Sequence, residues 1–116
     1  MIQSNTFQIE RPWGNFRQFT HNELSTVKII TVKPNEALSL QSHNKREEFW
    51  HVIGGSGFVE IGGVKKETTT GDEYEIKIEE KHRLSAGPEG IQVLEIATGD
   101  FDEIDIIHYE DKYGRV

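Results

Sequence analysis

Apolar and polar residues alternate along most of the chain, and a period of two is typical of β-strands whose two faces differ in burial. Five segments show this alternation most clearly: 25–32, 48–54, 57–63, 73–78 and 90–97. Turn-forming sequences separate them: Lys33-Pro34-Asn35, Gly54-Gly55, Gly62-Gly63, Gly71-Asp72 and Gly87-Pro88. Many short strands with frequent turns predict an all-β sandwich or barrel. The Gly62-Gly63 pair also suits a two-residue hairpin, because glycine accepts a positive φ at both positions.

The chain is long enough for one hydrophobic core, so residues 1–116 are predicted to form a single domain. The acidic tail from Gly99 onward is partly amphipathic, and Ile104, Ile106 and Ile107 could cover a barrel opening as a strand or as a helix. The pattern alone leaves both alternatives open.

Composition excludes several classes of function. A formal net charge of −7 disfavours nucleic-acid binding, which needs a basic surface to replace counterions. The absence of cysteine excludes disulfides and thiolate metal sites, so that histidine, carboxylate and amide groups remain as metal ligands. No apolar run approaches the roughly 20 residues of a membrane helix, and the N-terminus has no secretory pattern. A cytoplasmic protein that neither spans a membrane nor binds nucleic acid is therefore expected.

The stretch SLQSHNKREEFW gathers polar side chains between two apolar runs. Gln41 and His43 are two residues apart, so they share one face of a strand. A turn over 44–46 would return the chain as an antiparallel neighbour and let Glu48 face them from across the hairpin. Glu48 would then lie beside a tryptophan in a largely dry interior, where a carboxylate needs a metal, a cation or a proton.

A later histidine, His82, could add a second imidazole to this group. Amide, carboxylate and imidazole ligands suit Zn²⁺, Mn²⁺, Fe²⁺, Co²⁺ or Ni²⁺ and do not choose among these ions. The alternative interpretation is a solvated pair of His43 and Glu48 on a surface hairpin, with His82 as an ordinary structural histidine. Three histidines have no partner at ligand spacing and are expected not to bind metal: His21, His51 and His108.

Five blocks of sequence carry a family resemblance: RPWGNF (11–16), VKIITVKPNEALSLQSHNKREEFWHVIGGSG (27–57), HRL (82–84), VLEIATGDFDEIDI (93–106) and EDKYGR (110–115). The most specific part is the pattern LSLQ-x-H-x-x-R-x-E-x-W from Leu38 to Trp50. In this order the blocks resemble the cupin domain of type II mannose-6-phosphate isomerases. In larger members of that family the domain follows a mannose-1-phosphate guanylyltransferase domain.

The resemblance implies a small RmlC-like cupin, which is a double-stranded β-helix or jelly-roll barrel, with a divalent metal ion inside. Zinc is the ion expected first, with manganese, iron, cobalt or nickel as alternatives. The residues that match the family ligands are Gln41, His43, Glu48 and His82. The implied reaction interconverts mannose 6-phosphate and fructose 6-phosphate. A metal would polarise the sugar oxygens as a Lewis acid while a base moves a proton between C1 and C2.

The resemblance also implies which residues act on this phosphorylated sugar. Arg46 would contact the substrate, because a guanidinium can hold phosphate through two hydrogen bonds; alternatively it is an ordinary arginine of a surface turn. The expected catalytic residues are Arg46, Glu48 and His82. Weaker candidates for substrate contact are Arg11, Arg83 and Arg115. The sequence does not identify the base, and Glu47, His82 and Lys33 remain open.

The chain departs from the family pattern before and after His82. The family's proline, glycine and asparagine are replaced by Lys77, Glu79 and Ala86. The turn that leads into His82 is therefore expected to differ. Near the C-terminus Ile104 replaces an expected acid and His108 an expected arginine, which removes one candidate contact to an anionic substrate.

The sequence also bears on alternative functions and on the oligomeric state. The nucleotidyltransferase half is absent from this sequence, so GDP-mannose synthesis is not expected. The altered second block favours, as an alternative, a non-catalytic sugar- or nucleotide-sugar-binding cupin that assists a separate enzyme, and a cupin acting on another small carbohydrate or acid is a third alternative. By resemblance a homodimer is expected. Aromatic residues near the termini would cover its interface or close the barrel ends: Trp13, Phe16, Phe19 and Tyr113.

Overall fold

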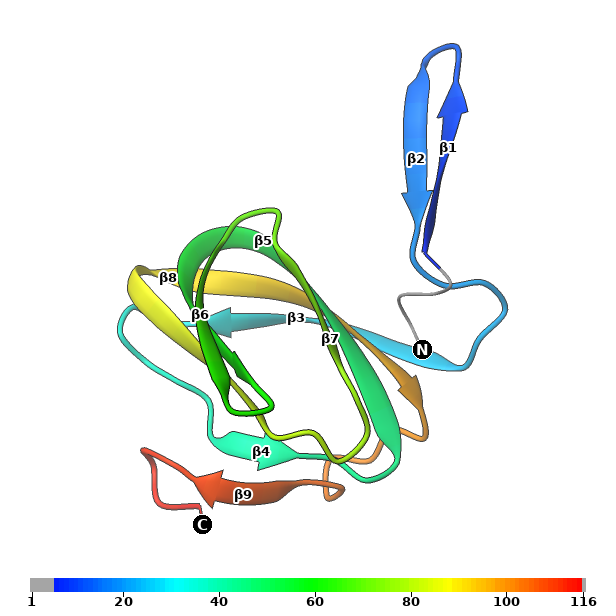
Figure 1. Cartoon of the computed structure of the whole chain (residues 1–116). Coiled ribbons are helices and arrows are strands. Elements are labelled where there is room, and N and C mark those ends of the chain that lie inside the picture. Colours follow the sequence, from blue (N-terminus) through cyan, green and yellow to red (C-terminus); the bar gives the residue numbers. More distant parts are fainter. Residues whose placement is uncertain (1–5, 116) are drawn as a thin grey trace.

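The computed structural model describes residues 6–115, and within that range every regular element is a β-strand (Figure 1). The strands are β1 (Phe7–Arg11), β2 (Gly14–Gln18), β3 (Ser25–Val32), β4 (Leu40–Ser42), β5 (Arg46–Ile61), β6 (Val64–Thr69), β7 (Glu73–Ile76), β8 (His82–Gly99) and β9 (Ile107–Glu110). None of the described segments is a helix that could cross a bilayer.

Two long strands, β5 and β8, pair antiparallel and form the frame of a barrel. One layer has the strand order β6-β5-β8-β4-β9. In the other layer β3 pairs with the second half of β8, and β7 pairs with the first half of β5. Each long strand therefore belongs to both layers, and Figure 1 shows the two ribbons curving around a common interior. The predicted all-β barrel is confirmed.

The sequence predicted turns at Gly54-Gly55 and Gly87-Pro88. This prediction is wrong, because both sites lie inside continuous strands. The pairing of β5 with β8 shifts register around the first of these sites. A Cβ atom on Gly57 would lie 2.0 Å from the carbonyl oxygen of Ser85, so the close approach of the two backbones requires glycine. The glycines let each long strand bend from one layer into the other, so the strand continues where a turn was expected.

Alternate residues of the long strands fill the interior of the barrel. One cluster of buried apolar residues forms the core: Val32, Trp50, Val52, Val59, Ile76, Leu84, Ala86, Ile91 and Val93. Burial of a large apolar side chain contributes about 1.5–3 kcal/mol, so this cluster is the main source of stability. Phe49 points to the opposite face of β5 and is covered by Phe19 and Ile96.

The C-terminal tail forms a strand and not a helix. β9 pairs with β4, with His108 opposite Gln41. Beyond β9, Lys112 and Tyr113 both bond to the carboxylate of Glu36, at 2.9 Å and 2.5 Å. The tail is thereby held along β4, at the edge of this layer and close to His43, which follows β4.

The β1–β2 hairpin stands away from the barrel (Figure 1). Its two strands pair with each other and with no other strand among the described residues. Arg17 contacts Glu73 at 2.5 Å, and the ring of Phe19 lies 5.8 Å from the ring of Phe49, so these contacts hold the base of the hairpin. Trp13, at the tip, is 73% exposed.

The turn from β7 into β8 holds Glu79 at a φ of 66°, in the left-handed region that favours glycine. The amide of Glu80 donates to the carbonyl of Lys77 (3.1 Å), and the amide of Glu79 donates to the carbonyl of His43 (2.7 Å). The sequence departure at Glu79 therefore adds backbone strain, and the chain still enters β8 at His82.

Replacing Glu79 with glycine should stabilise the protein, because a side chain in this conformation costs roughly 1 kcal/mol or more. We expect Glu79→Gly to raise the free energy of unfolding by about 0.5–1 kcal/mol in urea titrations with an unchanged m-value. Glu67→Gly, at an exposed position of β6, is the matched control and should destabilise the protein. Equal losses of stability in the two variants would contradict the assignment.

Candidate metal centre

A cavity of about 190 Å³ lies inside the barrel, where residues from both layers and from the tail converge. Its lining consists of Lys28, Ile30, Leu38, Gln41, His43, Arg46, Glu48, Trp50, His82, Glu95, Glu103, Ile106, His108 and Arg115. Most of these residues are polar or charged, whereas the rest of the interior is apolar. The cavity is therefore the part of the interior that suits a polar ligand.

Three of the cavity residues that could bind a metal ion lie close together. His43 follows β4, Glu48 lies on β5 and His82 begins β8, and they are 4%, 2% and 1% exposed. One ligand atom from each can be chosen so that all lie within 4.8 Å of one another. Gln41 is the register partner of His82 and lines the same cavity. The structure thus brings all four residues that were predicted as metal ligands to one place.

The two histidines present the same ring nitrogen to Glu48. Nδ1 of His43 lies 2.7 Å from the carbonyl oxygen of Asp105, and Nδ1 of His82 lies 2.9 Å from the carbonyl oxygen of Glu80. A carbonyl oxygen only accepts, so each Nδ1 must carry the proton. Each Nε2 then points toward the carboxylate of Glu48, at 3.6 Å from His43 and 3.1 Å from His82.

Glu48 is a buried carboxylate that is only partly satisfied by the protein. Its Oε2 atom accepts a hydrogen bond from Nε of Arg46 (3.2 Å), while its Oε1 atom is buried and receives none. Burial raises the pKa of Glu48, but Arg46 and the nearby His82 and His43, which are protonated at low pH, outweigh burial and lower it well below its usual value. Glu48 is therefore ionised.

The protonation state of His43 completes a donor set that fits a divalent ion. Burial lowers the pKa of His43, and the negative charge of Glu48 only partly offsets this effect. A neutral imidazole beside an ionised carboxylate is the form that binds metal. Two imidazole nitrogens, the orphaned carboxylate oxygen of Glu48 and the nearby amide of Gln41 suit zinc or another first-row divalent ion.

Arg46 is buried inside the barrel and does not lie at its rim or in a surface turn as an ordinary exposed arginine would. It is 4% exposed, and its Nη2 atom donates to Nε2 of His43 (3.3 Å). Its Nη1 atom donates to the carbonyl of Asp102 (3.1 Å), and its guanidinium lies 4.3 Å from the centroid of the Phe101 ring. Arg46 therefore compensates the charge of Glu48 from within the cavity wall.

The three other arginines predicted to contact substrate differ in position, and Arg11 lies exposed at the end of β1 and does not line the cavity. Arg83 follows His82 on the same strand, so alternation turns its side chain outward, where it pairs with Glu60 (2.7 Å) and Glu110 (3.0 Å). The structure does not bring Arg83 to the cavity. Arg115 lines the cavity and also pairs with Asp111 at 2.6 Å.

Glu95 is a cavity residue that sequence reasoning missed. It is 3% exposed, accepts a hydrogen bond from Nε1 of Trp50 (3.0 Å) and lies 3.6 Å from Nζ of Lys28. Burial, and then the negative charge of Glu48, raise the pKa of Glu95 to about 7. A carboxyl group with such a pKa can donate or accept a proton at neutral pH. Strand alternation over 90–97 places it among inward residues and could have identified it.

Two of the earlier candidates for the base do not line the cavity. Glu47 lies on the face of β5 opposite Glu48, and Lys33 is exposed after β3. His108 was expected not to bind metal, and it lines the cavity with its Nδ1 atom 2.7 Å from Oγ of Ser39. The family resemblance was the one sequence signal for this position, because it matches an arginine expected to contact an anionic substrate.

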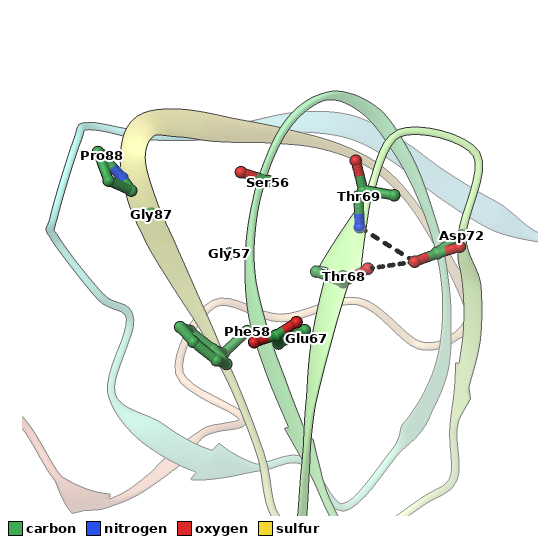
Figure 2. Close-up of a pocket in the computed structure, with 9 residues that line it drawn as sticks. All are labelled: Ser56, Gly57, Phe58, Glu67, Thr68, Thr69, Asp72, Gly87 and Pro88. Atoms are coloured by element: carbon green, nitrogen blue, oxygen red, sulfur yellow. Dashed lines mark hydrogen bonds between the residues drawn. The ribbon is translucent and has the colours of Figure 1, made fainter.

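A larger open groove of about 470 Å³ lies between the bends of β5 and β8 and the end of β6 (Figure 2). No histidine lines it, and the carboxylate of Asp72 is already engaged by the amide of Thr69 (3.0 Å) and the hydroxyl of Thr68 (3.2 Å). The groove is larger than the cavity, but buried ionisable groups with perturbed pKa values favour the cavity as the site.

Known proteins resemble this chain in sequence over almost its whole length. The family described as "Mannose-6-phosphate isomerase C-terminal" matches residues 2–111. The chain is 36% identical over 111 residues to the mannose-1-phosphate guanylyltransferase ManC of Salmonella typhimurium, and 36% identical over 110 residues to the xanthan biosynthesis protein XanB of Xanthomonas campestris. These alignments cover 94% and 93% of this chain but only 23% and 24% of the relatives. The chain thus spans about a quarter of their length.

Solved structures share the fold. A cupin protein from Bacteroides fragilis superposes with a TM-score of 0.60 at 25% identity, covering 70% of this chain and 74% of that one. An RmlC-like cupin from Shewanella frigidimarina gives 0.63 at 16% identity, covering 78% and 76%. These matches confirm the predicted RmlC-like cupin fold, a double-stranded β-helix. Because the family model also matches nearly the whole sequence, the chain belongs to the mannose-6-phosphate isomerase C-terminal family.

Proposed function

We propose that the protein is a metal-dependent isomerase of sugar phosphates, and that it interconverts mannose 6-phosphate and fructose 6-phosphate. The observation that carries this proposal is the convergence of His43, Glu48 and His82, with both Nε2 atoms directed at the carboxylate, in a buried polar cavity. The family to which the chain belongs supports the choice of reaction. A cytoplasmic location fits the proposal, because a phosphorylated substrate does not cross a bilayer unaided.

The side chains of the cavity divide the chemistry among them. Gln41, His43, Glu48 and His82 would hold a divalent ion, which when bound supplies Lewis-acid polarisation of the sugar oxygens. Glu95 is positioned to carry the proton between C1 and C2, because it lines the same cavity and Trp50 fixes one of its carboxylate oxygens. This assignment replaces Glu47 and Lys33 as candidates for the base.

Three cationic side chains of the cavity are the candidates for phosphate contact, and three glutamates line it beside them. Lys28, Arg46 and Arg115 all line it, although the chain as a whole carries a net charge of −7. Local cations of this kind can attract and orient a phosphate against an unfavourable overall field. Arg115 is the more accessible candidate for phosphate contact, since its side chain is 53% exposed while that of Arg46 is 4% exposed.

The alternative function is binding without turnover, by a domain that assists a separate enzyme. It is favoured by the altered segment before His82, where Lys77 and Glu79 replace the proline and glycine of the family pattern. The guanylyltransferase activity in the relatives' names belongs to those longer proteins, and it is not proposed for this chain. The two functions differ in whether a bound sugar phosphate is converted into product or only bound.

Purified protein supplied with zinc, manganese, iron, cobalt or nickel should convert fructose 6-phosphate into mannose 6-phosphate. Glu48→Gln should reduce kcat/KM at least about 100-fold, because it removes the charge that the two histidines surround. Glu60→Gln, which changes a carboxylate on the outer face of the barrel, should leave kcat/KM nearly unchanged. Thermal stabilisation by the sugar phosphate with no product from any of these ions would favour the binding function instead.

Glu95→Gln should lower kcat by about 10²–10⁴-fold, because the amide cannot accept a proton. The metal content of the variant, measured by elemental analysis, should remain that of the wild type, since Glu95 is not among the clustered ligands. Glu67→Gln, on an exposed position of β6, is the control. A Glu95→Gln enzyme with wild-type kcat would exclude Glu95 as the proton carrier.

We also propose that the partner of this chain is a second copy. An isolated two-stranded hairpin is marginally stable in water, so the projecting β1–β2 hairpin needs a surface. Among the described residues β3 pairs along one edge only, and its outward Val27 and Ile29 are 58% and 59% exposed. In a two-fold dimer, each hairpin could pack on the partner's β3, which would support the hairpin and bury the exposed apolar residues of β3.

The wild-type protein should therefore have a solution mass of about twice 13.3 kDa in light scattering after size exclusion. Trp13→Ser should shift the equilibrium toward the monomer, because Trp13 is the most exposed aromatic side chain of the hairpin. Val64→Ser, at an exposed apolar position of β6, should not. A monomeric wild type at micromolar concentration would overturn this assembly.

A further inference from the structure

The loop 100–106 connects β8 to β9 and contacts the turn that carries His43. The carbonyl oxygen of Asp105 accepts the hydrogen bond from Nδ1 of His43 (2.7 Å). The carboxylate of the same residue accepts hydrogen bonds from the amides of Asn44 and Lys45, both at 2.9 Å. One residue of the tail therefore holds the histidine ring and the backbone that follows it.

The same loop also holds Arg46. The carbonyl of Asp102 accepts from its guanidinium (3.1 Å), and the ring of Phe101 packs against it (4.3 Å from CZ to the ring centroid). The loop is itself closed by an internal bond, from the amide of Asp105 to the carbonyl of Asp102 (3.0 Å). The position of Asp105 is thus fixed independently of His43.

The bond to the carbonyl has a chemical consequence for His43. A carbonyl cannot donate, so it keeps the proton on Nδ1 and leaves Nε2 as an acceptor, which the bond from Nη2 of Arg46 also requires. Partners that fix the tautomer and the orientation of a ligand histidine typically change metal affinity by about 10–100-fold when they are lost.

We propose that Asp105 is a positioning residue for the metal centre. Its carbonyl sets the tautomer and the ring orientation of His43, and its carboxylate fixes the turn at 44–45 so that His43 stays against this carbonyl. The inference rests on the proposed metal function, and it adds that the tail, which contributes no clustered ligand, controls how tightly the ion binds.

The test compares two aspartates that fix turns in the same way. Asp105→Ala should weaken binding of Zn²⁺ and Co²⁺ about 10–100-fold, measured by competition with a chromophoric chelator. Asp105→Asn retains one acceptor oxygen and should show a smaller loss. Asp72→Ala is the matched control, because Asp72 caps the turn shown in Figure 2 far from the cavity, and it should change metal affinity less than twofold. Circular dichroism selects the variants that are folded.

A second readout does not depend on the metal. In the metal-free wild type, the ¹⁵N resonances of the His43 ring should report a protonated Nδ1 and an unprotonated Nε2, and Asp105→Ala should shift this pattern toward a mixture of tautomers. A wild-type His43 protonated on Nε2 alone would overturn the role of Asp105. Equal metal affinity in Asp105→Ala and wild type would overturn it as well.

These results also separate the inference from the function on which it rests. A wild-type protein that binds neither Zn²⁺ nor Co²⁺ would overturn the metal centre and the positioning role together, whatever the tautomer of His43. A wild type that binds metal tightly, with Asp105→Ala binding equally well, would overturn the positioning role alone.

Discussion

The ionised carboxylate of Glu48 lies in the interior of the barrel, where removing a charge from water costs on the order of several kcal/mol. The surrounding structure compensates this cost in an incomplete way. Arg46 donates one hydrogen bond, but the two histidines direct Nε2 atoms at the carboxylate while their protons lie on Nδ1, and one carboxylate oxygen receives no hydrogen bond. Such an arrangement does not stabilise the barrel by itself, whereas a bound cation would neutralise the buried charge of Glu48 and contact its free oxygen.

The long strands and the tail decide which groups can reach Glu48. β5 supplies the carboxylate, and β8, bent at its glycines, supplies His82 at one end and Glu95 near the other. The tail pairs with β4, and the carbonyl of Asp105 in the tail accepts a hydrogen bond from Nδ1 of His43, the ring nitrogen that faces away from Glu48. Ligands and their supports therefore come from segments far apart in the chain, and the pairing of the sheets determines the geometry of the cavity.

The departure of the second block from the family pattern illustrates how the chain adapts. Glu79 takes the left-handed conformation that glycine would take more easily, and hydrogen bonds to Lys77 and His43 close the turn around it. The cost is local strain, and His82 still faces Glu48 at 3.1 Å. The altered residues of the turn therefore do not move His82 away from Glu48.

Local alternation in the sequence was sufficient to predict an all-β barrel, because side-chain direction in a strand depends only on position. The spacing of Gln41 and His43 likewise predicted that they share one face. The hairpin expected to bring Glu48 opposite them was wrong, because β4 pairs with β8 and β9 while β5 pairs with β6, β7 and β8, and Glu48 meets the histidines across the barrel interior. Tertiary structure alone decided that Gly54-Gly55 bends a strand, that Arg46 is buried, and that Glu95 and Asp105 belong to the site. These outcomes depend on register and on long-range pairing between strands, which no local pattern specifies.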